Sequence, residues 1–157
     1  GLEFVTRKIT SWLARIKLHN SDPMPLGNLG AARDWGYAPE YIEMMVKMLG
    51  HDQPDDYVIS TNTEHTVREF LFSAAAEIGF ELFSDGEGAE EKCYDRKTGR
   101  LIAYVDPSFF RTSDRVSLRG DNSKAKKELG WKPKVLAPEI ARRMVNYDLK
   151  ITEAALI

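Results

Sequence analysis

Two arginines in turn-rich segments are the side chains of this chain best suited to hold an anionic ligand. Arg33 opens the run Arg33-Asp34-Trp35 after a short apolar stretch, and a guanidinium can bind a phosphate bidentately, which an ammonium cannot. Asp34 could orient this guanidinium, and Trp35 could pack beneath it. Arg111 follows two aromatic residues in a second loop, and Asp114 could accept hydrogen bonds from a sugar diol. Each set also fits a simpler role. Arg33 and Asp34 could form a surface ion pair beside a buried tryptophan, and Arg111 and Asp114 could form a solvated ion pair.

The first segment of the chain adds further positive charge. Residues 4–18 carry apolar side chains at helical spacing, which predicts an amphipathic helix. Four basic residues lie between the apolar ones: Arg7, Lys8, Arg15 and Lys17. They could face an anionic ligand, or they could form the solvated side of a charged helix.

The sequence offers little for metal or covalent chemistry. His51 and His65 have no second ligand nearby in the sequence, so we expect no metal site there. Cys93 is the single cysteine, which excludes an intramolecular disulfide and a cysteine-based metal cluster. No neighbouring residue would activate it as a nucleophile. The chain also contains no Gly-x-Gly-x-x-Gly turn, no P-loop and no Tyr-x-x-x-Lys pair.

The composition is typical of a single globular domain. The 157 residues include 22 Lys and Arg against 24 Asp and Glu, and 43% are apolar. The resulting charge of −2 argues against a dedicated nucleic-acid-binding protein. No apolar run approaches the roughly 20 residues of a membrane-spanning helix, and the basic residues of the first segment exclude a signal peptide. We therefore expect a cytoplasmic protein without membrane or nucleic-acid partners. Because the chain does not begin with Met, we also expect it to be a piece of something longer.

Helical periodicity recurs along the chain. Beyond residues 4–18, Pro39 suits the first turn of a helix whose apolar face we expect to comprise Tyr41, Met45, Met48 and Leu49. Thr66 and Glu69 have the spacing of a capping box, which predicts a helix that starts near residue 66 and ends at Gly79. Two more helices are expected, one from residue 122 or 123 to 129, ended by Gly130, and one that starts near residue 138.

Strand signals are fewer and shorter. We expect strands at Tyr57–Ser60, Phe80–Phe83 and Leu101–Val105. Residues 84–100 are polar and rich in glycine, and this composition predicts an exposed flexible loop or a hairpin. The strands are too few for a complete doubly wound sheet. The pattern therefore predicts a helix-rich α/β domain without a complete Rossmann sheet. It also predicts that a part of the protein that normally packs beside this domain is missing from the chain.

Several short motifs occur in an order that resembles one family. The early ones include Phe4-Val5-Thr6-Arg7-Lys8, Leu26-Gly27-Asn28-Leu29, Arg33-Asp34-Trp35-Gly36-Tyr37-Ala38 and Pro54-Asp55-Asp56-Tyr57. The later ones include Val67-Arg68-Glu69-Phe70, Val105-Asp106-Pro107, Phe110-Arg111 and Leu129-Gly130-Trp131-Lys132-Pro133. From residue 4 to about 150 the chain resembles the C-terminal half of the GDP-mannose 4,6-dehydratases, which are extended short-chain dehydrogenases/reductases.

The resemblance implies which part of such an enzyme this chain would supply. In the family, an N-terminal Rossmann half holds NADP, a catalytic Thr, a Glu base and the Tyr-x-x-x-Lys pair, and none of these lies in residues 1–157. The resemblance therefore implies a single GDP-sugar-binding domain over 1–157 with no catalytic residue and no cofactor of its own.

The same resemblance assigns a GDP-sugar site to Val5, Lys8, Lys17, Arg33, Arg111 and Asp114. Lys17 and Arg33 would face the nucleotide or its diphosphate, with Arg111 in the same region, and Asp114 would hold a ribose hydroxyl. Val5 to Lys8 would border the sugar nucleotide and the cofactor edge. Several positions depart from the family pattern, and among them Glu3 stands where Asn is usual and Asp114 where Glu is usual. A carboxylate at Glu3 would repel a diphosphate.

Three functional hypotheses remain open at this point. The chain is the substrate-binding part of an enzyme that converts GDP-mannose to GDP-4-keto-6-deoxymannose and water, or a stand-alone nucleotide- or protein-binding module, or an inactive folded remnant. For the isolated chain we expect weak binding of a GDP-sugar. We also expect a homodimer, because removal of the Rossmann half would uncover an apolar face.

Overall fold

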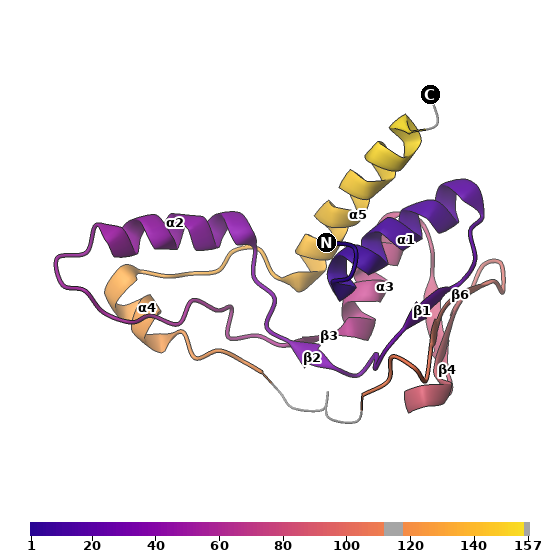
Figure 1. The fold of residues 1–157 in the computed structure, drawn as a ribbon, viewed down its shortest axis with the longest axis horizontal. Coiled ribbons are helices and arrows are strands. Elements are labelled where there is room, and N and C mark those ends of the chain that lie inside the picture. The colour runs from indigo at the N-terminus through magenta and orange to yellow at the C-terminus, as the bar shows by residue number, and fades with distance from the viewer. Residues whose placement is uncertain (112–117, 156–157) are drawn as a thin grey trace.

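The computed structural model describes residues 1–111 and 118–155. A four-stranded sheet forms one side of the molecule, in the order β1 (Met24–Leu26), β6 (Leu101–Val105), β5 (Lys92–Asp95) and β4 (Leu82–Asp85). β1 runs parallel to β6, with Leu26 opposite Val105, whereas β5 is antiparallel to both of its neighbours. The carboxyl ends of β1 and β6 therefore meet at the same edge of the sheet (Figure 1).

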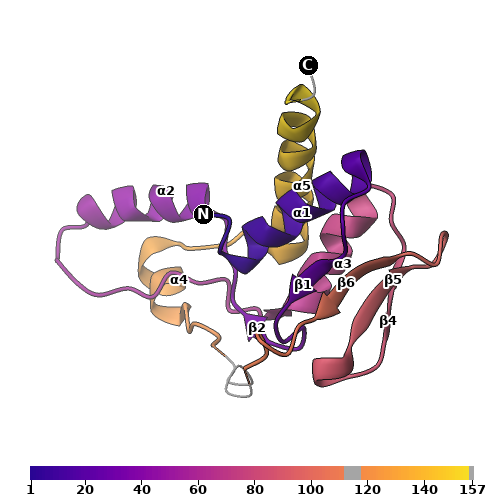
Figure 2. The same cartoon turned by 45° about the vertical axis from the view of Figure 1, so that its right-hand side comes forward.

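Three helices pack beside this sheet and enclose the main core. They are α1 (Val5–His19), α3 (Val67–Glu77) and α5 (Ala137–Ala154), and they lie together in both views (Figures 1 and 2). Fully buried side chains such as Ile9, Leu13, Phe70 and Ile102 join the helices to the two parallel strands. Each contributes roughly 1.5–3 kcal/mol through burial, so this core holds α1 firmly against the end of the sheet.

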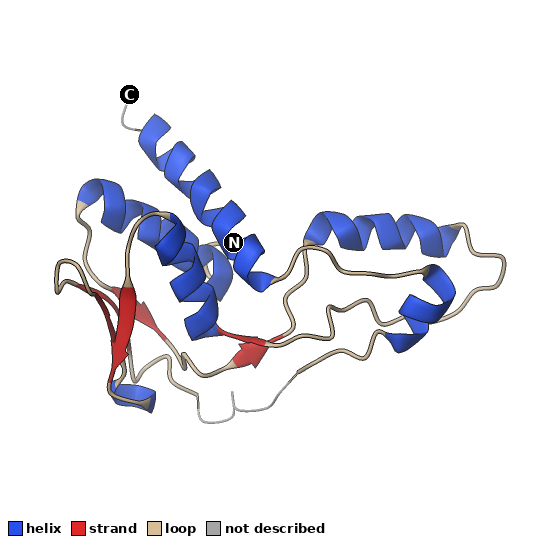
Figure 3. Cartoon of the chain, turned by 180° about the vertical axis from the view of Figure 1, so that it is seen from behind, coloured by secondary structure: helices blue, strands red, loops and turns tan. Residues whose placement is uncertain are grey.

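A second, smaller part of the molecule lies beyond a short ribbon. The ribbon is the antiparallel pair β2 (Ala32–Arg33) and β3 (His65–Thr66). On its far side lie α2 (Ala38–Leu49) and α4 (Ser123–Leu129), linked by long irregular segments (Figures 1 and 3). Met44, Ala125, Leu129 and Trp131 form the core of this part. The ribbon therefore carries Arg33 at the junction between the two parts.

Local sequence signals account for most helix boundaries. The predicted capping box is present, since Glu69 N donates to Thr66 Oγ1 at 3.1 Å and Thr66 N donates to Glu69 Oε2 at 2.7 Å. Gly130 ends α4 in the left-handed conformation, with φ of 66°. A proline occupies the first turn of both α2 and α5. The helix-rich α/β class expected from the sequence is confirmed.

The structure contains two of the three predicted strands. Residues 101–105 form β6 as expected, and the strand expected at residues 80–83 is β4, which begins and ends two residues later. No strand forms at 57–60, because the Ser60 carbonyl accepts hydrogen bonds from Trp131 Nε1 at 2.6 Å and Asn122 Nδ2 at 2.8 Å. Side chains thus take the place of a neighbouring strand.

The segment 84–100 contains most of a hairpin, which is one of the two expectations for it. β4 and β5 pair antiparallel around the 3-10 turn η1 (Gly88–Glu90). Glu91, Cys93 and Asp95 are buried on this hairpin. Within the described ranges no helix has the length and apolarity needed to cross a membrane.

Candidate functional site

The parallel pairing of β1 and β6 brings two loops together that are far apart in the sequence. Gly27 and Asn28 follow β1, and residues 106–111 follow β6. The loops approach so closely that a Cβ added to Gly27 would lie 2.7 Å from the Phe109 carbonyl oxygen. Only a residue without a side chain fits there, so Gly27 sets the place of Phe109 and of Arg111 beyond it.

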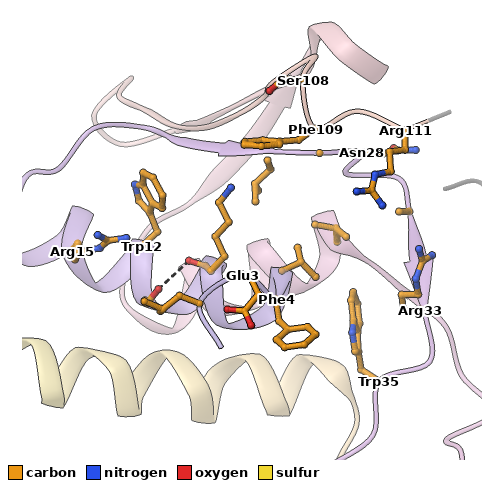
Figure 4. A pocket seen from close by; sticks show the side chains of 18 residues that line it. Glu3, Phe4, Trp12, Arg15, Asn28, Arg33, Trp35, Ser108, Phe109 and Arg111 are labelled. Atoms are coloured by element: carbon orange, nitrogen blue, oxygen red, sulfur yellow. Dashed lines mark hydrogen bonds between the residues drawn. The ribbon is translucent and has the colours of Figure 1, made fainter. Parts of the chain in front are cut away.

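A cavity of about 800 Å³ lies between these loops, the first turns of α1 and the β2–β3 ribbon. Four of the residues that we expected in a GDP-sugar site line it: Val5, Lys8, Arg33 and Arg111. Asp114 lies outside the described residues. Figure 4 shows Arg33 and Arg111 at one end of the cavity and Trp12 and Arg15 at the other.

The face of α1 decides which of its basic residues reach the cavity. Lys8, Trp12 and Arg15 follow the spacing of one helical face and line it. Lys17 does not, because it lies nine residues, about two and a half turns, from Lys8 and so points to the opposite side. Its Nζ lies 5.4 Å from the centre of the Phe80 ring. The structure therefore does not bring Lys17 to the other expected residues.

The ammonium of Lys8 lies inside the cavity, 4.5 Å from the centre of the Phe109 ring. Partial burial lowers the pKa of Lys8, and the nearby carboxylate of Asp106 offsets part of this effect. Asp106 is itself held by hydrogen bonds from Ser108 N at 2.9 Å and Ser108 Oγ at 2.7 Å. Lys8 is thus a partly desolvated cation, which favours interaction with an anionic ligand.

Arg33 and its neighbours in sequence have different roles. The Arg33 side chain lines the cavity, and its Nη1 donates to the carbonyl oxygen of Ala32 at 2.7 Å. Trp35 also lines the cavity and packs on Phe70, with ring centres 5.4 Å apart. A tryptophan at this place gives the cavity a rigid apolar wall.

Asp34 ties three segments together. Its carboxylate accepts hydrogen bonds from Thr61 N at 2.8 Å, Thr61 Oγ1 at 2.6 Å, Asn62 N at 2.9 Å and Gly120 N at 3.3 Å. The role that we considered for Asp34, to orient the Arg33 guanidinium, is not the one these contacts indicate. They indicate a residue that holds loops 60–63 and 118–120 against the strand that carries Arg33.

Other candidate residues serve the fold. Arg7 forms an ion pair of 2.7 Å with the buried Asp148 of α5, whose second oxygen accepts from Thr10 Oγ1 at 2.6 Å. Burial raises the pKa of the Cys93 thiol. Among the described residues, no group of His, Cys, Asp and Glu side chains is arranged to hold a metal ion.

Sequence reasoning missed several residues that line the cavity. Trp12, Phe4 and Phe109 are the largest of them, and Ser11 and Asn28 are polar ones. The spacing of Trp12 from Lys8 was the available signal, because residues four apart share a helical face. No local signal could have shown Phe109, since its place depends on the pairing of β1 with β6.

Comparison with solved structures shows which class of protein has this fold. The chain resembles RMD from Pseudomonas aeruginosa complexed with NADPH, with a TM-score of 0.74 at 16% identity over 96% of this chain and 44% of that one. It also resembles dTDP-glucose 4,6-dehydratase from Bacillus anthracis, with a TM-score of 0.67 at 18% identity over 97% of this chain and 41% of that one. The fold is therefore part of the α/β fold of the extended short-chain dehydrogenase/reductase enzymes.

Sequence comparison narrows the class to one family. A family profile described as GDP-mannose 4,6 dehydratase matches residues 1–144. GDP-mannose 4,6 dehydratase 2 of Caenorhabditis elegans is 44% identical over 98% of this chain and 40% of its own length. The Homo sapiens GDP-mannose 4,6 dehydratase is 40% identical over 96% of this chain and 41% of its own length. The chain belongs to the GDP-mannose 4,6-dehydratase family, as the motifs indicated, and spans about two fifths of the length of these relatives.

Proposed function

We propose that this chain binds a GDP-sugar in the cavity between α1 and the two loops, as the substrate-binding part of a GDP-mannose 4,6-dehydratase-like protein. The observation that carries the proposal is the convergence of Lys8, Arg33 and Arg111 on one cavity of about 800 Å³ in a member of this family. Three cations suit a diphosphate, because hydrogen bonds to charged groups are about twice as strong as those between neutral ones.

The parent reaction converts GDP-mannose to GDP-4-keto-6-deoxymannose and water. The residues of this chain fit the substrate side of such a reaction and not the cofactor side. The sequence has no glycine-rich turn at which a helix N-terminus could hold the pyrophosphate of NADP. We therefore assign to this chain the binding and orientation of the GDP-sugar, and no catalytic residue.

The arginine pair provides the test. Binding of GDP and of GDP-mannose to the 157-residue chain is measured by calorimetry and by ligand-observed magnetic resonance. We expect a Kd on the order of 1 mM, because Glu3 also lines the cavity and exposed charges are screened by salt. Arg33→Ala and Arg111→Ala each remove a charge-assisted contact and should weaken binding about ten- to a hundredfold.

Two further variants sharpen this test. Lys17→Ala should leave binding unchanged, because Lys17 does not line the cavity. Arg142→Ala removes an exposed arginine that pairs with Glu139 on α5, and it controls for the loss of positive charge. Equal binding signals from the wild type and both cavity arginine variants would rule out this site. That outcome would favour a protein-binding module or an inactive remnant.

We also propose that the isolated chain self-associates through the outer face of α2. Tyr41 and Met48 pack on the smaller core as expected, together with Met44, whereas Met45 and Leu49, which were expected on the same face, are exposed. The exposed side carries four apolar residues at helical spacing: Ile42, Met45, Val46 and Leu49. Their exposed fractions are 57%, 55%, 65% and 89%.

A second copy is the occupant that fits this stripe. The four residues are symmetric about the midpoint between Met45 and Val46. An antiparallel pair of α2 helices around a two-fold axis would therefore place Ile42 opposite Leu49 of the second copy. In this arrangement every exposed apolar residue of the stripe meets another, which removes the cost of its contact with water.

Sedimentation equilibrium over a wide concentration range tests this association. We expect a concentration-dependent dimer for the wild type and a monomer for Val46→Glu and Leu49→Glu. Ile151→Glu, a similar change at an exposed apolar residue of α5, should leave the dimer intact. A wild-type chain that stays monomeric throughout would contradict the proposal.

A cytoplasmic location also belongs to the proposal and is supported by the single buried, unpaired Cys93.

A further inference from the structure

A second cavity, of about 510 Å³, lies beside the β4–β5 hairpin, and the proposed function does not use it. Its volume falls within the usual range for small-molecule sites, roughly 300–1,000 Å³. We call it the hairpin cavity. Three glycines and six larger residues line it, and the larger ones are Asn28, Arg68, Ser84, Glu87, Glu91 and Phe110.

The loop after β6 separates the hairpin cavity from the GDP-sugar cavity. Phe109 lines the first cavity, and the next residue, Phe110, lines the hairpin cavity. Phe110 also packs against the main core, so it gives the hairpin cavity a fixed apolar wall. Asn28 lines both cavities. Binding in the hairpin cavity can therefore be examined apart from the binding of GDP.

A buried ion pair supplies the most constrained polar groups of the hairpin cavity. Glu91 is only 2% exposed, and its carboxylate accepts from Arg68 Nε and Nη2 at 2.6 Å each. The Arg68 side chain is 37% exposed, and within the described ranges its Nη1 makes no hydrogen bond. A guanidinium carries five N–H donors, of which this pair uses two. Arg68 thus keeps donors for a ligand while Glu91 balances its charge.

Asn28 adds a second donor. Its Oδ1 accepts from Gly30 N at 2.9 Å, which fixes the side chain in a turn and leaves Nδ2 to donate. In the part of the chain that the structure describes, Nδ2 has no hydrogen-bond partner. Because the turn already holds this side chain, little further ordering is needed when a ligand binds.

Glu87 and Ser84 supply acceptors on the hairpin. Glu87 is exposed directly before the turn η1, and its carboxylate forms no ion pair with a described residue. The turn is tight, because a Cβ added to Gly86 would lie 2.7 Å from the Glu90 carbonyl oxygen. Ser84 Oγ donates to Glu91 at 2.7 Å and keeps its lone pairs as acceptors.

The charges and hydrogen-bonding groups select one class of ligand. Arg68 contributes one positive charge, whereas Glu87 and Glu91 contribute two negative ones, so the lining disfavours an anion. The N–H groups of Arg68 and Asn28 cannot bind a cation, because they only donate. A hydroxyl group both donates and accepts, and it therefore suits donors and acceptors that lie around one cavity.

We infer that the hairpin cavity binds a neutral hydroxylated ligand, a monosaccharide or a glycosyl unit. Arg68 and Asn28 donate to its hydroxyl oxygens, and Glu87 and Ser84 accept from its hydroxyl groups. Phe110 contacts its apolar face. This site is additional to the GDP-sugar cavity, and the inference does not depend on the proposed function.

Two probes test the ligand class: methyl α-D-mannopyranoside, which is neutral and hydroxylated, and inorganic phosphate, which is an anion. Each is titrated into the 157-residue chain and followed in an assigned ¹H–¹⁵N spectrum. The amide signals of Gly86 and Gly88 report on the hairpin cavity, and that of Gly27 reports on the GDP-sugar cavity. We expect the mannoside to shift the Gly86 and Gly88 signals and phosphate to leave them in place.

Two variants remove one contact each. Glu87→Ala removes an acceptor, and Asn28→Asp keeps the oxygen that holds Gly30 N but removes the Nδ2 donor. Each should weaken mannoside binding by roughly two- to tenfold, as expected for one hydrogen bond. Glu90→Ala is the matched control, since Glu90 is an exposed carboxylate of the same turn that does not line the cavity. The spectra also show that each variant is folded.

The outcomes separate this site from the first cavity. Weaker mannoside binding in Glu87→Ala and Asn28→Asp, with wild-type binding in Glu90→Ala, would support the inference. It would be overturned if the mannoside moved no signal, or moved only that of Gly27. Equal mannoside affinity in all three variants would also overturn it, as would phosphate moving the Gly86 and Gly88 signals where the mannoside does not. None of these results bears on the GDP titrations that test the proposed function.

Discussion

At the scale of single residues, Gly27 controls how the cavity is built. Its missing side chain allows the Phe109 carbonyl oxygen to approach, and the residues that follow in that loop include Arg111. The close contact involves backbone on one side, so no side chain can rotate out of the way. The cost of a larger residue must therefore appear as a shift of the loop.

We predict that Gly27→Ala loses about 1–3 kcal/mol of stability, the usual cost of overpacking, and also weakens GDP binding. Thermal unfolding and ligand titration of the same preparations measure both effects. Gly50→Ala is the control, because Gly50 has φ of −92° and its Cβ would lie 3.7 Å or more from its nearest neighbours. An alanine at residue 27 that leaves both stability and binding unchanged would show that the two loops are not rigidly coupled.

At the scale of secondary-structure elements, one buried ion pair joins α3 to the hairpin. Arg68 Nε and Nη2 each donate to a carboxylate oxygen of Glu91 at 2.6 Å, and Glu91 Oε1 also accepts from Ser84 Oγ at 2.7 Å. Glu91 is only 2% exposed. Burial by itself would raise the pKa of Glu91, but the hydrogen bonds from Arg68 and Ser84 outweigh it and hold the pKa below its ordinary value.

We predict a loss of stability in acid that depends on this pair. Because the folded pKa of Glu91 is lowered, the pair stabilises the fold fully above the ordinary glutamate pKa, about 4.3. The contribution is lost as the pH falls through the folded pKa. Glu91→Gln should cost about 3 kcal/mol near neutral pH, the low end for a broken buried pair because Arg68 keeps contact with water. It should also flatten the stability curve in acid.

Chemical denaturation at several pH values measures this effect. Glu81→Gln is the matched control, since Glu81 pairs with Lys97 at 3.0 Å where both side chains are 56% exposed. An exposed pair of this kind contributes at most about 1 kcal/mol. Similar losses in the two glutamine variants would mean that burial of Glu91 adds nothing to the pair.

At the scale of the whole molecule, the two parts of the chain meet at the β2–β3 ribbon, and the cavity opens beside it. We predict that the 157-residue chain neither binds NADP nor converts GDP-mannose. The physical reason is that its sequence contains no glycine-rich phosphate turn and no Tyr-x-x-x-Lys pair. Titration with NADPH monitored by its fluorescence, and product analysis after incubation with GDP-mannose and NADP, check both statements. Detectable product from this chain alone would refute them.

Much of the molecule was predictable from local sequence. The start of α3 follows from Thr66 and Glu69, and the end of α4 follows from Gly130, because capping depends on residues within one turn. The motifs likewise pointed to the family and to Arg33, Lys8 and Arg111. These features rest on short-range hydrogen bonds or on residue types, and both can be seen in the sequence.

The tertiary structure decided what local patterns left open. The expected strand at 57–60 does not form because Asn122 and Trp131, far along the chain, take its Ser60 carbonyl. The inward face of α2 is set by its contact with Trp131, since the helix is apolar on more than one side. Lys17 is separated from Lys8 by the rotation of α1. Phe109 joins Trp12 at the cavity only because β1 pairs with β6, and such long-range pairing depends on burial of the whole core rather than on any neighbouring residue.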